Sequence, residues 1–158
     1  LLYVGRMRVE KGIFSLANLI KNKRDIFLTI VGAEKKTNYN INQSNIKIQQ
    51  NQNNKIKLIK LYDDHNIFVL PSFTEGHPMA LLEALSRLRP VIIFKDIEHV
   101  IGNKKGIFVA NRNSESFFKK IDYIKKNYEK IQDEMKKNKL PTKDIFLKEF
   151  KDLILKSF

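Results

Sequence analysis

Short runs of apolar residues alternate with amphipathic stretches along this chain. Most of the runs are continuous rather than alternating with polar residues, which is typical of strands buried on both faces of a sheet. A glycine or a proline closes several of them, as Gly5, Gly32 and Pro71 do. The pattern predicts six strands, of which the third is weak: 1–4, 26–31, 46–49, 67–70, 90–94 and 107–110.

The stretches between the runs repeat apolar residues at steps of three and four, the spacing of one helix face. Pro78 suits a first helical turn, Asn113 or Ser114 suits an N-cap, and Pro141 suits a helix end. In the second helix, Ile56 and Ile59 are expected to turn inward, together with Leu58 or Tyr62. The predicted helices are 13–21, 55–62, 78–88, one long helix from 114 to about 140, and 144–158; the polar stretch 33–45 predicts an irregular loop or a short helix.

Strands that alternate with helices predict an α/β fold: a single Rossmann-like three-layer domain with a parallel sheet. The length of 158 residues fits one core, and the sequence has no internal repeat. The chain opens on Leu1 directly in a predicted strand. We therefore expect residues 1–158 to form one domain of a longer protein, with another domain before Leu1.

Composition narrows the class of protein. The chain is 42% hydrophobic, which suits a globular domain, and it has no cysteine, so disulfides and thiolate metal sites are excluded. The longest apolar stretches, such as 26–33, fall short of the roughly 20 residues of a membrane helix. No signal peptide is apparent, so a cytoplasmic location is expected.

The net charge of +13 comes from 30 Lys and Arg against 17 Asp and Glu. Such an excess suits nucleic acid, an anionic membrane or a small anionic ligand. It also suits a solvated surface in a chain rich in Lys, Asn and Ile, because most lysines fall on outer helix faces. Nucleic acid is disfavoured, since the phenylalanines fall at core positions rather than between cations.

The loop after the first strand carries two candidate ligand-binding cations, Arg6 and Lys11. In "VGRMRVEKG", Arg6 and Lys11 stand between Gly5 and Gly12, without the spacing of a P-loop or of a dinucleotide-binding loop. Arginine grips two phosphate oxygens and lysine supplies a point charge, so the loop suits a phosphate group. A solvated loop with unrelated charges is the alternative.

Two acids flank the start of the helix in "FTEGHPMALLE". Glu75 and Gly76 precede Pro78, and Glu83 lies about one turn inside the helix and leans back toward its start. Between the two acids, the free N–H groups near Met79, Ala80 and Leu81 form an anion site. Carboxylates accept hydrogen bonds from vicinal hydroxyls. A ligand in the order nucleoside, diphosphate, sugar would therefore place its ribose at Glu83, its diphosphate at the amides and its sugar at Glu75. Helix stabilisation by Glu83 and a capping role for Glu75 remain as alternatives.

The evidence for the other candidate residues is weaker. His77 lies in the same loop and either contacts phosphate or sugar or is a plain loop histidine, and Gly32 lets a backbone approach that could line a nucleotide pocket. "YDDH", residues 62–65, is expected at the opposite end of the sheet, and the three histidines form no metal-binding pattern. No metal and no cofactor are expected.

"GRMRVEKG" and "VLPSFTEGHPMALLEALSRLRPVI" resemble the two hallmark motifs of the family 4 glycosyltransferases, which have the GT-B fold. The resemblance spans the second, donor-binding domain of that fold. It departs from the family in the Asn-rich segment after Gly32 and in "SRLRP", where a glycine turn is usual.

The resemblance implies that Arg6 and Lys11 bind and neutralise the donor diphosphate, that Glu75 contacts the sugar and that Glu83 holds the ribose. It implies amides near Ala80 and Leu81 on the phosphate, with Gly76 and His77 beside them. It further implies retaining transfer without a metal from a nucleotide-diphosphate sugar, such as a UDP-sugar, to a saccharide or lipid-linked acceptor.

The family's acceptor domain is expected to precede Leu1, so the chain alone is expected to bind the donor with little or no transfer. The final helix, 144–158, resembles the segment that packs toward that domain. Peripheral contact with the inner face of the membrane is a further expectation. The alternatives are a basic module for nucleic acid or anionic membrane, and a GT-B sugar-nucleotide epimerase.

Overall fold

The computed structural model describes residues 1–33, 41 and 43–142. The strands are β1 (Leu2–Val4), β2 (Leu28–Ala33), β3 (Ile46–Gln50), β4 (Phe68–Leu70), β5 (Val91–Phe94) and β6 (Ile107–Ala110). The helices are α1 (Ile13–Ile20), α2 (Lys55–Asp63), α3 (Met79–Ser86), α4 (Ser114–Lys126) and α5 (Tyr128–Met135), with short 3₁₀ segments η1 (Val9–Lys11) and η2 (Lys95–Val100). The predicted loop over 33–45 and the predicted helix 144–158 fall mostly or wholly outside the described residues.

The six strands form one all-parallel sheet in the order β3-β2-β1-β4-β5-β6. The predicted α/β fold with a parallel sheet is confirmed. The chain starts in β1 at the centre, fills one side through β2 and β3, and then crosses to the other side through β4. The strand order therefore reverses between β1 and β4, and in sheets of this kind ligands bind beyond the carboxyl ends of the strands at that point.

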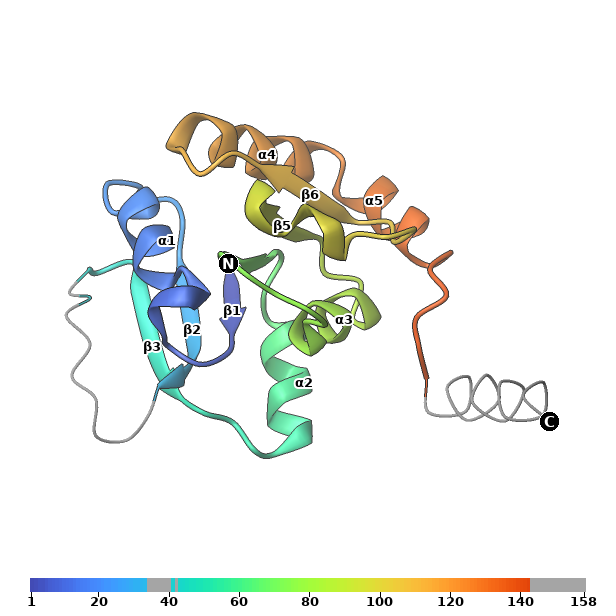
Figure 1. Ribbon diagram of the computed structural model, residues 1–158, viewed down its shortest axis with the longest axis horizontal. Helices are drawn as coiled ribbons and strands as arrows, with labels where there is room; N and C mark the ends of the chain where they lie inside the picture. Colours follow the sequence, from blue (N-terminus) through green and yellow to red (C-terminus); the bar gives the residue numbers. More distant parts are fainter. Residues whose placement is uncertain (34–40, 42, 143–158) are drawn as a thin grey trace.

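Helices cover both faces of the sheet (Figure 1). On one face, the Lys23 ammonium after α1 lies 4.6 Å from the centre of the Phe118 ring in α4. On the other face, a hydrogen bond from Tyr62 in α2 to Glu83 in α3 joins those two helices. The helix that follows β1 therefore packs opposite those that flank β4, as right-handed crossovers in the two directions require.

The core consists of the continuous apolar strands and the inner helix faces. Rings from several elements lie within it: the ring centres of Tyr62 and Phe68 are 5.7 Å apart, and those of Phe94 and Phe117 are 5.8 Å apart. In α1 the predicted inner face is confirmed, since its four apolar positions are buried: Ile13, Leu16, Ala17 and Ile20.

The prediction of one long helix after β6 is wrong, because the helix is interrupted at Asn127 and continues as a separate helix, α5. This residue leaves the helical conformation (φ −119°, ψ 21°), and its side-chain amide donates to the Tyr123 carbonyl at 2.8 Å. The break redirects α5, so that Gln132 donates to the carbonyl of Leu88 at 3.0 Å and the buried Met135 packs on Gly106. An apolar stripe at steps of three and four continues across the break, and the sequence pattern therefore does not reveal it.

The predicted inner face of α2 is also wrong in part. Ile56 and Ile59 are 79% and 45% exposed, whereas Tyr62 is 2% exposed. The helix contacts the sheet mainly through its last turn, because its first turn projects beyond the sheet edge toward solvent (Figure 1). The second strand also differs from its predicted range, since β2 runs through Gly32 instead of ending before it.

The "SRLRP" turn after α3 has no glycine, and Leu88 adopts the left-handed conformation there (φ 54°). Leucine tolerates this conformation poorly. The turn is held by neighbours: the N–H of Arg89 donates to the Ala84 carbonyl at 2.9 Å, and Leu88 packs partly buried against the core. The chain thus keeps the shape of a glycine turn through tertiary contacts.

Candidate functional site

The loops that follow β1 and β4 meet at the carboxyl edge of the sheet, where the strand order reverses. They enclose an open hollow of about 340 Å³. Its lining includes Tyr3, Gly5, Arg6 and Lys11 from the first loop and Glu75, His77, Pro78, Met79 and Ala80 from the second. We call this hollow the central crevice. It gathers most of the residues that the sequence analysis selected.

Two glycines permit close backbone contacts near the crevice, and one of them, Gly12, joins its two loops. Gly12 has φ 66°, and a Cβ atom there would overlap the carbonyl oxygen of Pro71. Gly32 has φ 137°, and a Cβ atom there would overlap the carbonyl oxygen of Gly5. The backbone that approaches Gly32 is thus that of Gly5, and Gly32 itself is not part of the lining of the central crevice. The N–H of Phe73 donates to the Glu10 carbonyl at 2.9 Å and further joins the two loops.

Lys11 and Glu75 form an ion pair across the crevice. The Nζ of Lys11 lies 2.7 Å from Oε1 of Glu75, and the Ser72 hydroxyl donates to the same oxygen at 2.6 Å. The two side chains are only 20% and 10% exposed, so water screens the pair less than it would on an open surface. The structure thus brings both predicted residues together and pairs them with each other.

Arg6 is the exposed cation of the crevice. Among the described residues no carboxylate lies within ion-pair distance of Arg6, so its guanidinium is available for an anion. The backbone of Arg6 is held in place by the Tyr3 hydroxyl, which donates to the Arg6 carbonyl at 2.8 Å. Burial, and then the charge of Glu75, raise the pKa of Tyr3 well above its usual value, so this hydroxyl keeps its proton.

The start of α3 faces the crevice with Pro78 as its N-cap residue. Of the amides expected to be free, that of Leu81 is not, because it donates to the Pro78 carbonyl at 3.1 Å. The 3₁₀-type first turn accounts for this difference. Within the described part of the chain, the N–H groups of Met79 and Ala80 have no such partner, so they are the amides that remain for an anion.

Glu83 lies on a neighbouring side of α3, outside the lining of the central crevice. Its Oε2 accepts a hydrogen bond from the Tyr62 hydroxyl at 2.8 Å. It lines a smaller hollow of about 230 Å³ between α2 and α3, which we call the helix groove: Lys55, Leu58, Ile59, Tyr62, Glu83, Ser86 and Arg87. The Tyr62 hydroxyl is also 3.3 Å from the carbonyl oxygen of Ala80, a residue of the crevice lining. The two hollows therefore approach each other over the first turn of α3.

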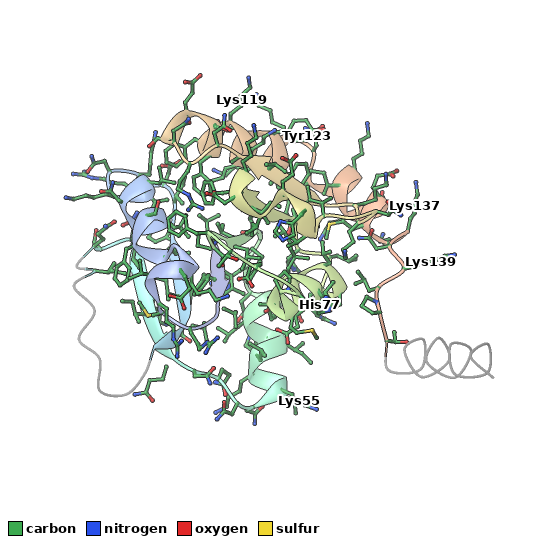
Figure 2. All side chains as sticks on the ribbon, viewed as in Figure 1. Lys55, His77, Lys119, Tyr123, Lys137 and Lys139 are labelled. Atoms are coloured by element: carbon green, nitrogen blue, oxygen red, sulfur yellow. The ribbon has the colours of Figure 1, made fainter. Side chains whose placement is uncertain are left out.

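Histidines flank the loop after β4. His77 is exposed beside the start of α3 (Figure 2) and lines the crevice, and Gly76 is exposed before it. His99, which the sequence analysis did not select, donates through Nε2 to the backbone carbonyl of Glu75 at 2.8 Å. It thereby ties η2 to the residue that pairs with Lys11.

Arg112 is a second residue that the sequence analysis missed. Its guanidinium carbon lies 4.0 Å from the ring centre of Phe73 and 4.4 Å from that of Phe94. It donates to the carbonyls of Pro71 at 2.8 Å and Ser72 at 3.2 Å, and it pairs with Asp96 at 2.7 Å. Arg112 thus fixes the chain segment that carries Ser72, the partner of Glu75.

Other charged groups lie away from the crevice. Asp63 and Asp64 of "YDDH" form ion pairs with Arg87 at 2.7 Å and with Lys60 at 2.9 Å. In the portion of the chain that the structure describes, no three His, Asp or Glu side chains cluster as a metal site would require. Lys119, Lys137 and Lys139 lie on the outside of the molecule (Figure 2).

The fold and the crevice define a Rossmann-like α/β domain whose pocket, at the strand-order reversal, is lined by two cations and the start of α3. Residues 1–140 match the family model of the glycosyl transferases group 1. The chain belongs to this family. The assignment agrees with the resemblance that its two loop motifs carry.

A curated relative is a protein of Bacillus subtilis (strain 168), TuaC, which is named as a teichuronic acid biosynthesis glycosyltransferase. The two sequences are 35% identical over 91 residues, which are 57% of this chain and 23% of the relative. The chain therefore matches less than a quarter of that protein's length.

Solved structures show the same fold. Sucrose-phosphate synthase from Thermosynechococcus elongatus superposes with a TM-score of 0.77 at 17% identity, over 99% of this chain and 45% of that one. The pneumococcal O-GlcNAc transferase GtfA, in complex with UDP and GlcNAc, gives a TM-score of 0.67 at 16% identity, over 98% of this chain and 35% of that one. The chain spans less than half of either protein. No helix among the described residues is long and apolar enough to cross a membrane.

Proposed function

We propose that this chain is the donor-binding domain of a retaining, family 4 type glycosyltransferase. It binds a nucleotide-diphosphate sugar whose sugar is passed to a saccharide or lipid-linked acceptor. The observation that carries the proposal is the convergence of Arg6, Lys11 and the start of α3 on one crevice at the strand-order reversal. The family membership of the chain supports the same reading.

The crevice suits a diphosphate. The exposed guanidinium of Arg6 can grip two oxygens, and the amides of Met79 and Ala80 point from a helix start, where the helix dipole favours negative charge. Lys11 adds a second cation once the ligand competes for it with Glu75. As the bond between sugar and diphosphate breaks, charge grows on the leaving phosphate, and these fixed groups stabilise it without a metal ion.

The helix groove suits the nucleoside. Glu83 offers its carboxylate to a pair of ribose hydroxyls, and the apolar side chains of Leu58 and Ile59 offer a surface for the base. Glu75, at the other side of the crevice, is placed to accept from a sugar hydroxyl, with Gly76 and His77 beside it. In this arrangement the nucleoside lies in the helix groove, and the diphosphate and then the sugar lie in the central crevice.

The donor nucleotide and the acceptor are inferred from the relatives. The pneumococcal transferase was crystallised with UDP, so a UDP-sugar is the first donor to test. The Bacillus relative carries the name of a polysaccharide pathway, which supports a surface polysaccharide or its lipid-linked precursor as the acceptor. Transfer needs a further domain that binds the acceptor, so this domain alone binds the donor and transfers little. The cytoplasm, at the inner face of the membrane, is the location that suits these substrates.

Calorimetric titration of the purified protein with UDP, GDP and ADP, each at two salt concentrations, tests this function. We expect one nucleotide to bind saturably, and Glu83→Ala to weaken it by about 1.5–3 kcal/mol through loss of a charged hydrogen bond. Binding that falls steeply with salt and ignores Glu83→Ala would instead indicate a basic module for nucleic acid or anionic membrane. Conversion of the sugar nucleotide without an acceptor would indicate an epimerase.

A further inference from the structure

A buried tyrosine connects α2 to the carboxylate of Glu83. The Tyr62 side chain is 2% exposed, and its ring packs on Phe68 with 5.7 Å between ring centres. Its hydroxyl donates to Oε2 of Glu83 at 2.8 Å. The ring is therefore fixed by the core, and the hydroxyl emerges at the floor of the helix groove.

The hydroxyl has one proton and two acceptors within reach. The Glu83 oxygen is at 2.8 Å and the Ala80 carbonyl oxygen at 3.3 Å, so the shorter, charge-assisted bond takes the proton. Among the residues that the structure describes, none donates a hydrogen bond to Oε1 of Glu83. One carboxylate oxygen is thus occupied and the other keeps its acceptor capacity.

We propose that Tyr62 is the positioning residue for Glu83 in nucleoside recognition. It holds Oε2, restricts the rotation of the Glu83 side chain and leaves the two lone pairs of Oε1 for the pair of ribose hydroxyls. This inference rests on the proposed function, since it takes Glu83 as the ribose-binding group. It adds a residue on α2 to a site whose other groups lie on α3 and on the loops after β1 and β4.

A purely structural tyrosine would behave differently. Loss of its hydroxyl would lower stability but would change the affinity for every nucleotide alike. A positioning hydroxyl acts through Glu83, so its loss affects ligands that offer both ribose hydroxyls more than ligands that lack one. The preference for ribose over 2′-deoxyribose therefore separates the two roles.

The experiment compares binding of UDP, GDP and ADP with binding of dUDP, dGDP and dADP by calorimetry. The variants are Tyr62→Phe, Glu83→Ala, the double variant, and Tyr128→Phe as a matched control. Tyr128 also loses a hydroxyl whose bond, to the Asn66 carbonyl at 2.7 Å, lies outside both hollows. Thermal melting confirms that each variant is folded, and Glu83→Asp replaces Tyr62→Phe if the latter does not fold, because the shorter acid lengthens and weakens the bond with the hydroxyl.

We expect Tyr62→Phe to weaken ribonucleotide binding by about three- to tenfold, to reduce the preference for ribose, and to have no further effect in the Glu83→Ala background. Tyr128→Phe should leave the preference unchanged. A Tyr62→Phe protein that keeps the wild-type affinity and preference overturns the positioning role while Glu83→Ala still supports the proposed function. A wild-type protein that binds none of the six nucleotides overturns both.

Discussion

The ammonium of Lys11 lies 2.7 Å from the carboxylate of Glu75, although the two residues are 64 positions apart in the chain. Lys11 lies at the end of the loop after β1, and Glu75 lies in the loop after β4. The proposed function gives Lys11 to a diphosphate and Glu75 to a sugar. In the structure each neutralises the other, so donor binding must draw Lys11 at least partly toward the phosphate.

Glu75→Gln should therefore separate binding from transfer. The neutral amide holds Lys11 less tightly, so we expect a nucleoside diphosphate to bind severalfold more tightly, while transfer of the sugar falls by a factor of about 100 or more. Calorimetry with the nucleotide and an assay of transfer by the complete enzyme measure the two effects. Glu134→Gln is the matched control, because Glu134 forms an exposed pair with Lys137 at 2.6 Å. Weaker nucleotide binding by Glu75→Gln would contradict the competition for Lys11.

Arg6→Ala should weaken a nucleoside diphosphate much more than the nucleoside. The guanidinium is exposed in the crevice and reaches only the phosphates in the proposed mode, so we expect a loss of about 1.5–3 kcal/mol for UDP and almost none for uridine. Calorimetry with both ligands measures this difference. Arg8→Ala controls for charge alone, since Arg8 lies in the same loop outside the crevice lining and is 53% exposed. An equal loss for both ligands would mean that Arg6 does not bind the diphosphate.

Most of the fold could be predicted because it depends on local patterns. Continuous apolar runs and helical spacing locate the six strands and the helices around them, and the parallel sheet follows from their alternation. The break at Asn127 could not be predicted, since the apolar stripe continues across it. The outward position of Ile56 and Ile59 depends on how little of α2 the sheet covers, which no local pattern records.

The part of the candidate site that lies within single loops could be predicted, because each loop motif contains its own charged residues. Arg6, Lys11, Glu75 and His77 were selected from two loops, and they line one crevice. The residues that hold the site groups and Glu83 in place could not be found in this way. Tyr62, His99 and Arg112 act from other elements, and each reads as a core or surface residue in its own segment. Their roles depend on contacts with residues far away in the sequence, which a local pattern does not show.

Arg112→Leu should destabilise the domain more than the loss of a surface arginine does. The substitution leaves the carbonyls of Pro71 and Ser72 without their donor and removes the guanidinium between two rings, so we expect a loss of about 2–3 kcal/mol in the free energy of unfolding. Urea denaturation measures it. Arg87→Leu is the control, because that arginine pairs with Asp63 at the surface and should cost no more than about 1 kcal/mol. Equal losses would show that the arginine between the rings does not hold the loop.

His65 should make the stability depend on pH. Its Nδ1–H donates to the Leu61 carbonyl at 2.6 Å, and its Nε2 accepts from the Thr29 hydroxyl at 2.7 Å when the ring is neutral. Burial is the main cause that lowers its pKa below the ordinary value of 6.5. The unfolded chain therefore binds the proton more readily than the folded one. Its stabilising contribution is complete above pH 6.5 and is lost as the pH falls through the lowered pKa.

Urea denaturation of the wild-type protein between about pH 8 and about pH 5 should show this loss of stability toward acid. In His65→Gln, which has no group to protonate there, we expect a smaller change over the same range. His77→Gln is the control, because that ring is exposed at the crevice and makes no hydrogen bond with the described residues. Should His65→Gln retain the full pH dependence of the wild type, the proton must bind elsewhere, and the half-buried ring between Leu61 and Thr29 is not its origin.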